Sequence, residues 1–268
     1  MTTAPTPPTP DWLDRAAYTL DFEETFAGPH LDSDRWVDHY LPHWTTPDRS
    51  AARYRLGPTG LQLRIEADQP AWLPEDGELR VSNLQTGTTS GPLGSSRGPM
   101  IYREGLTIRT PQRDRRLYAP AEGLVEATLR ASADPTVMLA FWLVGFGHPQ
   151  HDRGELCVAE LFGDAVLPNQ ARVNTGVKAH QDPRLRDDMT TLTLDLDATQ
   201  PHTYAVAWNA IQARFYVDDR LVRTVDQGMN YPLFLLVDLF EFPAGPERDP
   251  ATYPKTAEVL TVRGHRHR

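Results

Sequence analysis

The chain has 268 residues, 40% of them hydrophobic, and a formal net charge of −9. This length suffices for one large β domain, and the acidic balance argues against a nucleic-acid-binding protein. Cys157 is the single cysteine, which excludes an internal disulfide framework and a zinc site built from several cysteines. The sequence contains no apolar run long enough to predict a membrane span.

The first ten residues are rich in Pro and Thr. They lack the basic start and apolar core of a secretory signal, so the default expectation is a cytoplasmic protein. We expect residues 1–15 to form a disordered tail, residues 16–264 to form a single domain, and residues 265–268 to form a second, solvated tail.

Strand patterns recur throughout the expected domain, and no long amphipathic helix is apparent. Alternating apolar and polar residues predict strands at 18–26, 61–65, 124–130, 171–180 and 259–263. Continuous apolar runs, which are typical of strands buried on both faces, cover 137–145 and 232–241. Two alternating segments around Asp218 and Asp219 predict a hairpin with a two-residue turn. This pattern favours an all-β sandwich or barrel.

One strand-like run, residues 154–163, carries two carboxylates among apolar residues. Burying an unpaired carboxylate is costly, so the pair calls for an explanation. Glu155 and Cys157 share one face of a regular strand, whereas Glu160 has the opposite parity. A β-bulge near residues 158–159 would aim all three side chains into one cleft. Two carboxylates on one cleft wall are what glycoside hydrolysis requires, although two unrelated acids on an edge strand would give the same spacing.

The run resembles the active-site strand of glycoside hydrolase family 16, the laminarinase, lichenase and agarase family. The bulged version of the family pattern is Glu-x-Asp-x-x-Glu, and the chain has Glu155-Leu-Cys157-Val-Ala-Glu160. The resemblance implies a retaining endo-type glycoside hydrolase, or a transglycosylase, acting on a β-linked polysaccharide such as a β-glucan or galactan. By the same resemblance Glu155 is the nucleophile and Glu160 the general acid/base, whereas Cys157 replaces the central Asp of the family.

Residues 202–218 resemble the family's His-x-Tyr-x-x-x-Trp … Phe-Tyr-Val-Asp-Gly segment, and residues 137–145 resemble its Pro-Ala-Phe-Trp-Leu-Leu strand. The fold that this implies is a β-jelly-roll sandwich of two antiparallel sheets with a concave substrate cleft. The family resemblance also favours secretion, whereas the first ten residues favour a cytoplasmic protein. Leu260 stands where the family has an Asp near a structural calcium, so we expect no calcium site. The expected hydrolysis needs no metal and no organic cofactor.

Five further residues are candidates for contact with the glycan. Each has a structural alternative: a Trp can be a packed core aromatic, and the His can be solvated at a strand end. At the position of Asp238 the family usually has Asn. The candidates are Trp142, Trp44, Lys178, His180 and Asp238.

Two other functions stay open on the sequence. The protein could be a carbohydrate-binding protein on the same scaffold without turnover, because the thiol of Cys157 is a weak hydrogen-bond donor in place of a carboxylate. Cys157 could instead be a nucleophile itself, although two flanking carboxylates would raise its pKa. In each case we expect a monomer whose partner is a polysaccharide or oligosaccharide, with no nucleic acid and no membrane.

Overall fold

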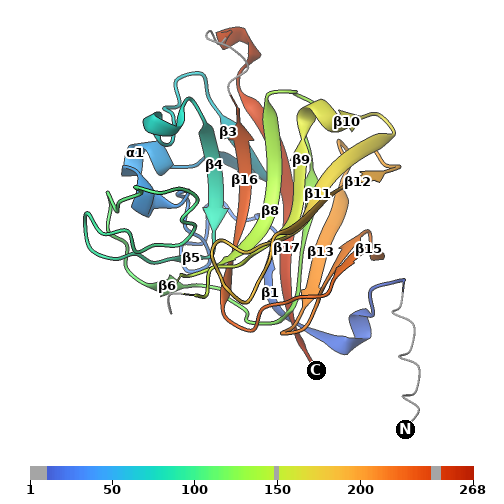
Figure 1. Ribbon diagram of the computed structural model, residues 1–268. Helices are drawn as coiled ribbons and strands as arrows, with labels where there is room; N and C mark the ends of the chain where they lie inside the picture. The colour runs from blue at the N-terminus through green and yellow to red at the C-terminus, as the bar shows by residue number, and fades with distance from the viewer. Residues whose placement is uncertain (1–10, 148–150, 243–248) are drawn as a thin grey trace.

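The computed structural model describes residues 11–147, 151–242 and 249–268. Two large antiparallel sheets pack face to face, as Figure 1 shows. The expected all-β jelly-roll sandwich is confirmed. The described residues include no helix with the length and apolar character needed to span a membrane.

One sheet has eight strands, in the order β15-β14-β13-β7-β17-β3-β2, with β1 also paired to β17. Its strands are β1 (Tyr18–Glu24), β2 (Arg53–Gly57), β3 (Gly60–Ile65), β7 (Gly123–Arg130), β13 (His202–Trp208), β14 (Ala213–Val217), β15 (Arg220–Val225) and β17 (Lys255–His267).

The other sheet has seven strands, in the order β10-β11-β9-β8-β16-β4, with β12 also paired to β11. Its strands are β4 (Arg80–Gln85), β8 (Val137–Gly145), β9 (Glu155–Phe162), β10 (Val166–Leu167), β11 (Gln170–Lys178), β12 (Asp188–Leu194) and β16 (Leu233–Glu241).

Little else is regular. β5 (Gly87–Thr88) and β6 (Arg115–Arg116) form a two-stranded sheet. Among the described residues there is one short α-helix, α1 (Pro47–Ser50), which lies among the loops. Short 3₁₀ helices occur at Arg15–Ala17, Pro42–Trp44, Pro74–Asp76, Gly163–Ala165 and Pro250–Thr252.

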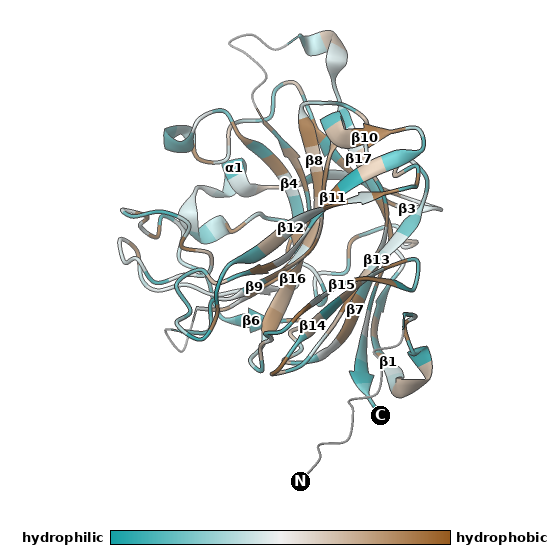
Figure 2. Ribbon diagram, turned by 45° about the vertical axis from the view of Figure 1, so that its right-hand side comes forward, coloured by the Kyte–Doolittle hydropathy of each residue, from teal (hydrophilic) through white to brown (hydrophobic). Residues whose placement is uncertain are grey.

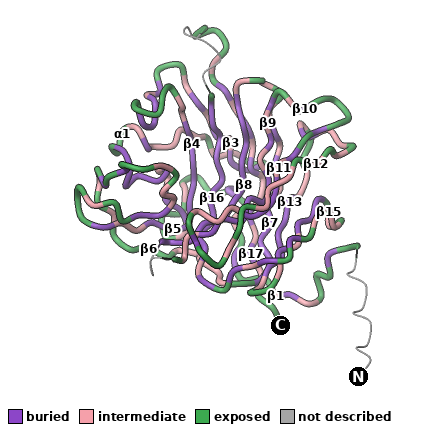
Figure 3. The backbone as a smooth tube through the Cα atoms, in the orientation of Figure 1, coloured by how far each residue is buried: buried purple, intermediate pink, exposed green. Residues whose placement is uncertain are grey.

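β8 and β16 are buried along their whole length, as Figure 3 shows. One side of each strand faces the apolar core between the sheets. The other side, here called the outer face, packs against loop residues such as Tyr40, Trp72 and Leu106. Cover on both faces explains why these two strands are continuously apolar, which Figure 2 shows as brown ribbon.

The hairpin expected at Asp218 and Asp219 is present between β14 and β15. Both turn residues have positive φ, 48° and 65°. A two-residue turn with this backbone matches the twist of the strands that it joins, and Asp tolerates it better than most residues.

Both expected tails are shorter than the sequence suggested. Leu13 is buried and its N–H donates to the carbonyl of Asp219 at 2.8 Å, so the chain already packs on β15 before residue 16. Residues 1–10 lie outside the described part. At the other end, β17 continues through His267 and pairs there with Tyr18 of β1. The expectation that residues 265–267 form a tail is wrong, because they pair with β1 as a strand, although Arg266 and His267 are exposed as expected.

Candidate active site

A β-bulge in β9 brings the two glutamates onto one face, as the parity argument required. Trp142 pairs with Cys157 and Phe141 pairs with Ala159, which leaves Val158 without a partner on β8. Val158 and Ala159 both contribute to the core between the sheets. Because Val158 is an extra residue, the side chain of Glu160 returns to the outer face of the sheet.

The neighbouring strand accommodates this bulge with a glycine. Gly176 of β11 pairs with Cys157 and has φ +147°. A Cβ at this position would lie 2.1 Å from the carbonyl oxygen of Asp188. Only glycine fits such a close approach with this backbone conformation.

Glu155, Cys157 and Glu160 lie together: one ligand atom from each falls within 4.8 Å of the others. Lys178, at the end of β11, bridges the two carboxylates. Its Nζ is 3.0 Å from Oε1 of Glu155 and 2.8 Å from Oε1 of Glu160. Within the described part of the chain this trio is a group of side chains close enough to share a cation. The ammonium of Lys178 already takes that position, so the residues present do not favour a metal ion.

His180 holds the other oxygen of Glu155, with Nε2 2.6 Å from Oε2. The side chain is only 13% exposed, so the alternative of a solvated histidine at a strand end is wrong. His180 and Gln181 both have positive φ, 46° and 69°. Consecutive non-glycine residues in this region are uncommon, and here they turn the imidazole back over the glutamate.

The loop that carries His180 is fixed to the start of β9. Asp182, which is buried, accepts a hydrogen bond from the hydroxyl of Tyr231 at 2.8 Å. The same hydroxyl accepts from the backbone N–H of Gly154 at 2.9 Å, next to Glu155. Arg184 adds an ion pair to Asp182. These contacts position His180, and nothing in the sequence pattern pointed to Tyr231 or Asp182.

The site keeps a buried negative charge on Glu155. Burial alone would raise the pKa of this carboxyl, since it is 2% exposed. The hydrogen bond from His180 and the charge of Lys178 outweigh burial and hold the pKa below its ordinary value. The two carboxylates in turn raise the pKa of Lys178, which stays protonated. Glu155 is therefore charged at neutral pH.

Cys157 is a neutral thiol in this setting. Burial, Glu160 and Glu155 raise its pKa well above the ordinary value. Its Sγ donates to the carbonyl oxygen of Asn174 at 3.7 Å. Asn174 also donates from Nδ2 to Oε2 of Glu160 at 3.3 Å, a contact that the sequence analysis missed. The surroundings lack the nearby helix N-terminus or unshared cation that activates a nucleophilic cysteine.

Trp142 and Asp238 form a buried pair beside the glutamates. The indole Nε1 of Trp142 donates to Oδ2 of Asp238 at 2.5 Å. Burial raises the pKa of Asp238 well above its usual range, and the charge of Glu155 raises it further against the opposing indole hydrogen bond. Trp142 is 5% exposed on the outer face, so the pair forms the floor next to Glu155.

Trp44 does not lie on the surface of the site. It is completely buried, and its Nε1 donates to the carbonyl of Pro99 at 3.0 Å. The expectation that Trp44 offers a platform to sugar is wrong for this structure, because the loop 37–47 packs Tyr40 and Trp44 inward against the outer face of the sheet. Of the two readings of Trp44, the packed aromatic is the one observed.

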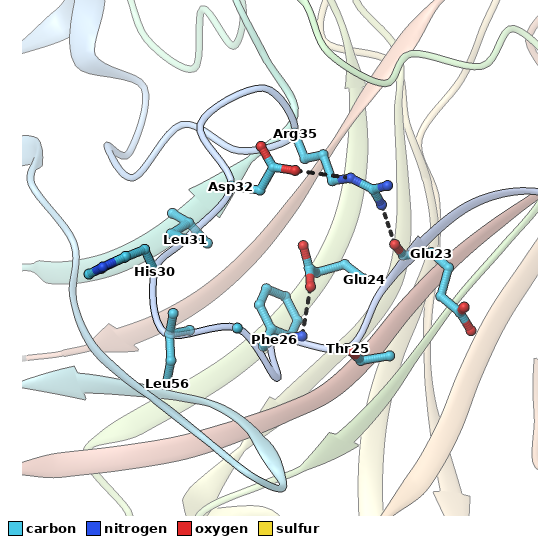
Figure 4. A pocket seen from close by; sticks show the side chains of 10 residues that line it. Glu23, Glu24, Thr25, Phe26, His30, Leu31, Asp32, Arg35 and Leu56 are labelled. Atoms are coloured by element: carbon cyan, nitrogen blue, oxygen red, sulfur yellow. Dashed lines mark hydrogen bonds and ion pairs between the residues drawn. The ribbon is translucent and has the colours of Figure 1, made fainter.

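A separate cavity of about 300 Å³ lies near β1, and Figure 4 shows its lining. Several of its charged groups already have partners: Arg35 pairs with Asp32 at 3.3 Å, and Glu24 accepts from the backbone N–H of Phe26 at 2.7 Å. None of the catalytic candidates lines this cavity.

Comparison with known proteins agrees with this geometry. A family model for glycosyl hydrolases family 16 matches residues 104–239, which is half of the chain and includes the bulged strand. No curated protein sequence matches the chain.

Solved structures resemble the chain over almost its whole length. A GlcNAcα1-4Gal-releasing endo-β-galactosidase from Clostridium perfringens matches with a TM-score of 0.80 and 25% identity, covering 97% of this chain. The chain spans 65% of the length of that enzyme. A laminarinase from a Flavobacterium species has a TM-score of 0.62 at 16% identity and covers 92% of this chain and 100% of its own. The laminarinase catalytic domain from Thermotoga maritima has a TM-score of 0.64 at 12% identity, over 94% and 99%.

Proposed function

The chain belongs to glycosyl hydrolases family 16, and we propose that it is a retaining endo-glycosidase that cleaves an internal bond of a β-linked glycan. The observation that carries this proposal is the approach of Glu155 and Glu160 across the bulge. Their ligand atoms lie within 4.8 Å. Retaining enzymes hold the two carboxyl groups about 5–5.5 Å apart, whereas inverting enzymes need about 6.5–9.5 Å to admit a water.

The two glutamates take different roles because their surroundings differ. Glu155 is buried and charged, held by His180 and Lys178, which suits a nucleophile that attacks the anomeric carbon. Glu160 is 17% exposed, which suits a group that exchanges protons with the leaving sugar and then with water. Glu160 donates a proton to the leaving oxygen as the glycosyl-enzyme forms, and takes one from water as that intermediate is hydrolysed.

The ammonium of Lys178 assists the attack by Glu155. It pairs with both carboxylates and, with His180, keeps Glu155 in the ionised form that a nucleophile needs. His180 fixes the rotamer of Glu155 through its second oxygen. Together they substitute for the hydrogen bond that the neutral thiol of Cys157 cannot give.

We infer that a β-galactosidic bond is the best first substrate. The endo-β-galactosidase has the higher TM-score, 0.80 against 0.62 and 0.64 for the two laminarinases. A β-glucan is the next choice on the same scaffold.

The test is to incubate the protein with β-galactans, mucin-type glycans and β-glucans and to follow the products by proton NMR. We expect oligosaccharides whose new reducing ends appear first as the β-anomer. First appearance of the α-anomer would refute the retaining mechanism.

A carbohydrate-binding protein without turnover is the second candidate. The specific observation in its favour is that Lys178 neutralises part of the charge of both glutamates in a site whose floor is largely buried. If the protein binds a glycan of the panel but releases no product from any of them, it is a binding protein without turnover.

A further inference from the structure

We propose that a cavity beside the candidate active site binds an anionic substituent of the glycan, a sulfate ester or a carboxylate. This inference rests on the proposed function and adds the charge of the substrate to it. The cavity has a volume of about 180 Å³, and its lining includes Arg97, Arg116, Asp114, Ser90 and Phe146.

The cavity lies close to Glu155 on the same side of the sheet. Val144 of β8 pairs with Glu155, and Phe146 follows two residues later on the outer face, in the apolar cluster that contains Trp142. The antiparallel pairing continues past the strand, since the N–H of Gly145 donates to the carbonyl of Gly154 at 3.0 Å. Two residues of a strand span about 7 Å, so the cavity is within reach of a sugar next to the one held at Glu155.

Arg116 is exposed, and two neighbouring side chains orient its guanidinium. Its guanidinium lies over the ring of Phe146, 4.4 Å from the centroid. One edge faces Asp114, with Nε 3.6 Å from Oδ2. Stacking on an aromatic ring fixes the plane of a guanidinium and leaves its remaining donors free for a planar or tetrahedral anion.

Arg97 adds a second cation to the lining of the cavity. Its side chain is exposed, and it has no ion-pair partner among the described residues. Its backbone is fixed, because the N–H of Gly91 donates to its carbonyl at 2.6 Å. The lining of the cavity therefore contains two guanidinium groups, those of Arg97 and Arg116, and one carboxylate, that of Asp114. Its net charge is positive. Paired guanidinium donors are the preferred partners of oxyanions in proteins.

The wider charge pattern supports the same ligand. Residues 86–119 contain six arginines and two acids, a local balance of 6 − 2 = +4 in a chain of −9. Two of these arginines are paired with Asp76 and Glu75. At the cavity Arg116 is paired with Asp114, and Arg97 has no ion-pair partner among the described residues. A polyanionic glycan would be repelled by an acidic protein unless a positive surface met it near the cleavage site.

The experiment compares matched glycans that differ in charge alone. One pair is a sulfated galactan and its desulfated form, and the other is a glycan with carboxylate-bearing sugars and its carboxyl-reduced form. We expect the wild type to favour the charged member of at least one pair by about tenfold or more in kcat/KM. Which pair responds tells sulfate from carboxylate. We expect Arg97→Met and Arg116→Met each to lower that preference by about tenfold, since a charge-assisted contact is lost.

Two controls keep the outcomes separate. Arg55→Met removes an exposed arginine from β2 of the other sheet, and we expect it to leave the preference unchanged. Arg116→Lys keeps the charge without the planar fork, which guards against misfolding of the Met variant. Binding is measured in parallel with Glu155→Gln protein by calorimetry at two salt concentrations. Equal affinity for charged and neutral glycans, or a preference that survives both Arg→Met changes, would overturn the proposal. Absence of cleavage with intact binding preference would instead count against the proposed hydrolysis.

Discussion

Two buried glutamates, one in each sheet, have nearly the same chemical surroundings. Glu155 is 2% exposed and Glu126 is 3% exposed. Each accepts hydrogen bonds from one histidine and one cationic side chain. The partners are His180 and Lys178 for Glu155, and His265 and Arg15 for Glu126. Burial raises the pKa of both carboxyls, yet these partners bring both below the ordinary value, to about 2 for Glu126.

The two sites differ in the second carboxylate that the cationic side chain contacts. Arg15 joins Glu126 to Asp219 of the β14–β15 turn, and so ties the start of the chain to the outside of the eight-stranded sheet. Lys178 joins Glu155 to Glu160, a second carboxylate that the bulge has turned onto the same face. A buried glutamate with a depressed pKa is therefore not in itself a catalytic site. What distinguishes the two regions is the place of the second carboxylate: Glu160 shares a strand face with Glu155, whereas Asp219 belongs to a turn.

The largest expected effect tests this distinction directly. We expect Glu155→Gln and Glu160→Gln each to lower kcat/KM for glycan cleavage by about 10³-fold or more, because each removes one of the two reacting groups. Glu126→Gln should leave kcat/KM within about twofold at neutral pH. Reducing-end release measures activity, and circular dichroism checks the fold. Unchanged cleavage in either of the first two variants would remove that residue from the mechanism.

Lys178→Met should have the next largest effect. We expect kcat/KM to fall by about 10- to 100-fold, since the carboxylates lose their shared cation. Lys178 lowers the pKa of Glu155, so without it that pKa rises and the acid limb of the pH profile moves to higher pH. The measurement is kcat/KM from pH 4 to 8. Arg15→Met is the matched control on the other glutamate, and an acid limb that stays in place in Lys178→Met would contradict this role.

For Glu126 the expected effect is on stability rather than activity. Its folded pKa of about 2 lies below the ordinary value of 4.5, so its contribution is complete above about pH 4.5 and is lost as pH falls toward 2. The shift corresponds to about 3 kcal/mol in the free energy of unfolding, of which about 2 kcal/mol should disappear between pH 6 and 3.

Urea titrations of wild type and Glu126→Gln at both pH values test this. We expect the stability gap between the two proteins to close as the pH falls. A gap that stays constant from pH 6 to 3 would show that the carboxylate of Glu126 does not contribute through its ionisation.

The strand-level features of the fold and site could be predicted because they depend on neighbours in sequence. Period-two patterns and parity mark the strands and require the bulge that joins Glu155 to Glu160. The continuous apolar runs of β8 and β16 likewise signalled cover on both faces, and the acidic turn signalled the hairpin. The strand ends were less certain, as the extension of β17 to His267 illustrates.

Side-chain positions set by distant loops could not be predicted. Trp44 is buried by contact with Pro99, 55 residues away in the chain. The turn of His180 onto Glu155 depends on Asp182 and Tyr231 in separate segments. The family resemblance made Lys178 a candidate without showing that its ammonium bridges both carboxylates. These contacts arise from tertiary packing, which local sequence patterns do not encode.

The smallest effect is expected at Cys157, the third member of the trio. The surroundings of Glu126 contain no counterpart of this cysteine among the described residues. The thiol is buried and neutral, and it donates a weak hydrogen bond to the carbonyl of Asn174. We expect Cys157→Ala to keep kcat/KM within about threefold, with a loss of about 1 kcal/mol in the free energy of unfolding from the deleted sulfur. Cys157→Asp should keep or increase cleavage, because its carboxylate would join the charges that Lys178 already balances.

Activity of the two variants and of the wild type after treatment with iodoacetamide provides the measurement. A native enzyme that resists the reagent is expected, since the raised pKa and complete burial of Cys157 suppress the thiolate. If both variants fold but lose all cleavage, the sulfur itself takes part in the reaction. The difference between the two buried glutamates would then rest on the cysteine as well as on the second carboxylate.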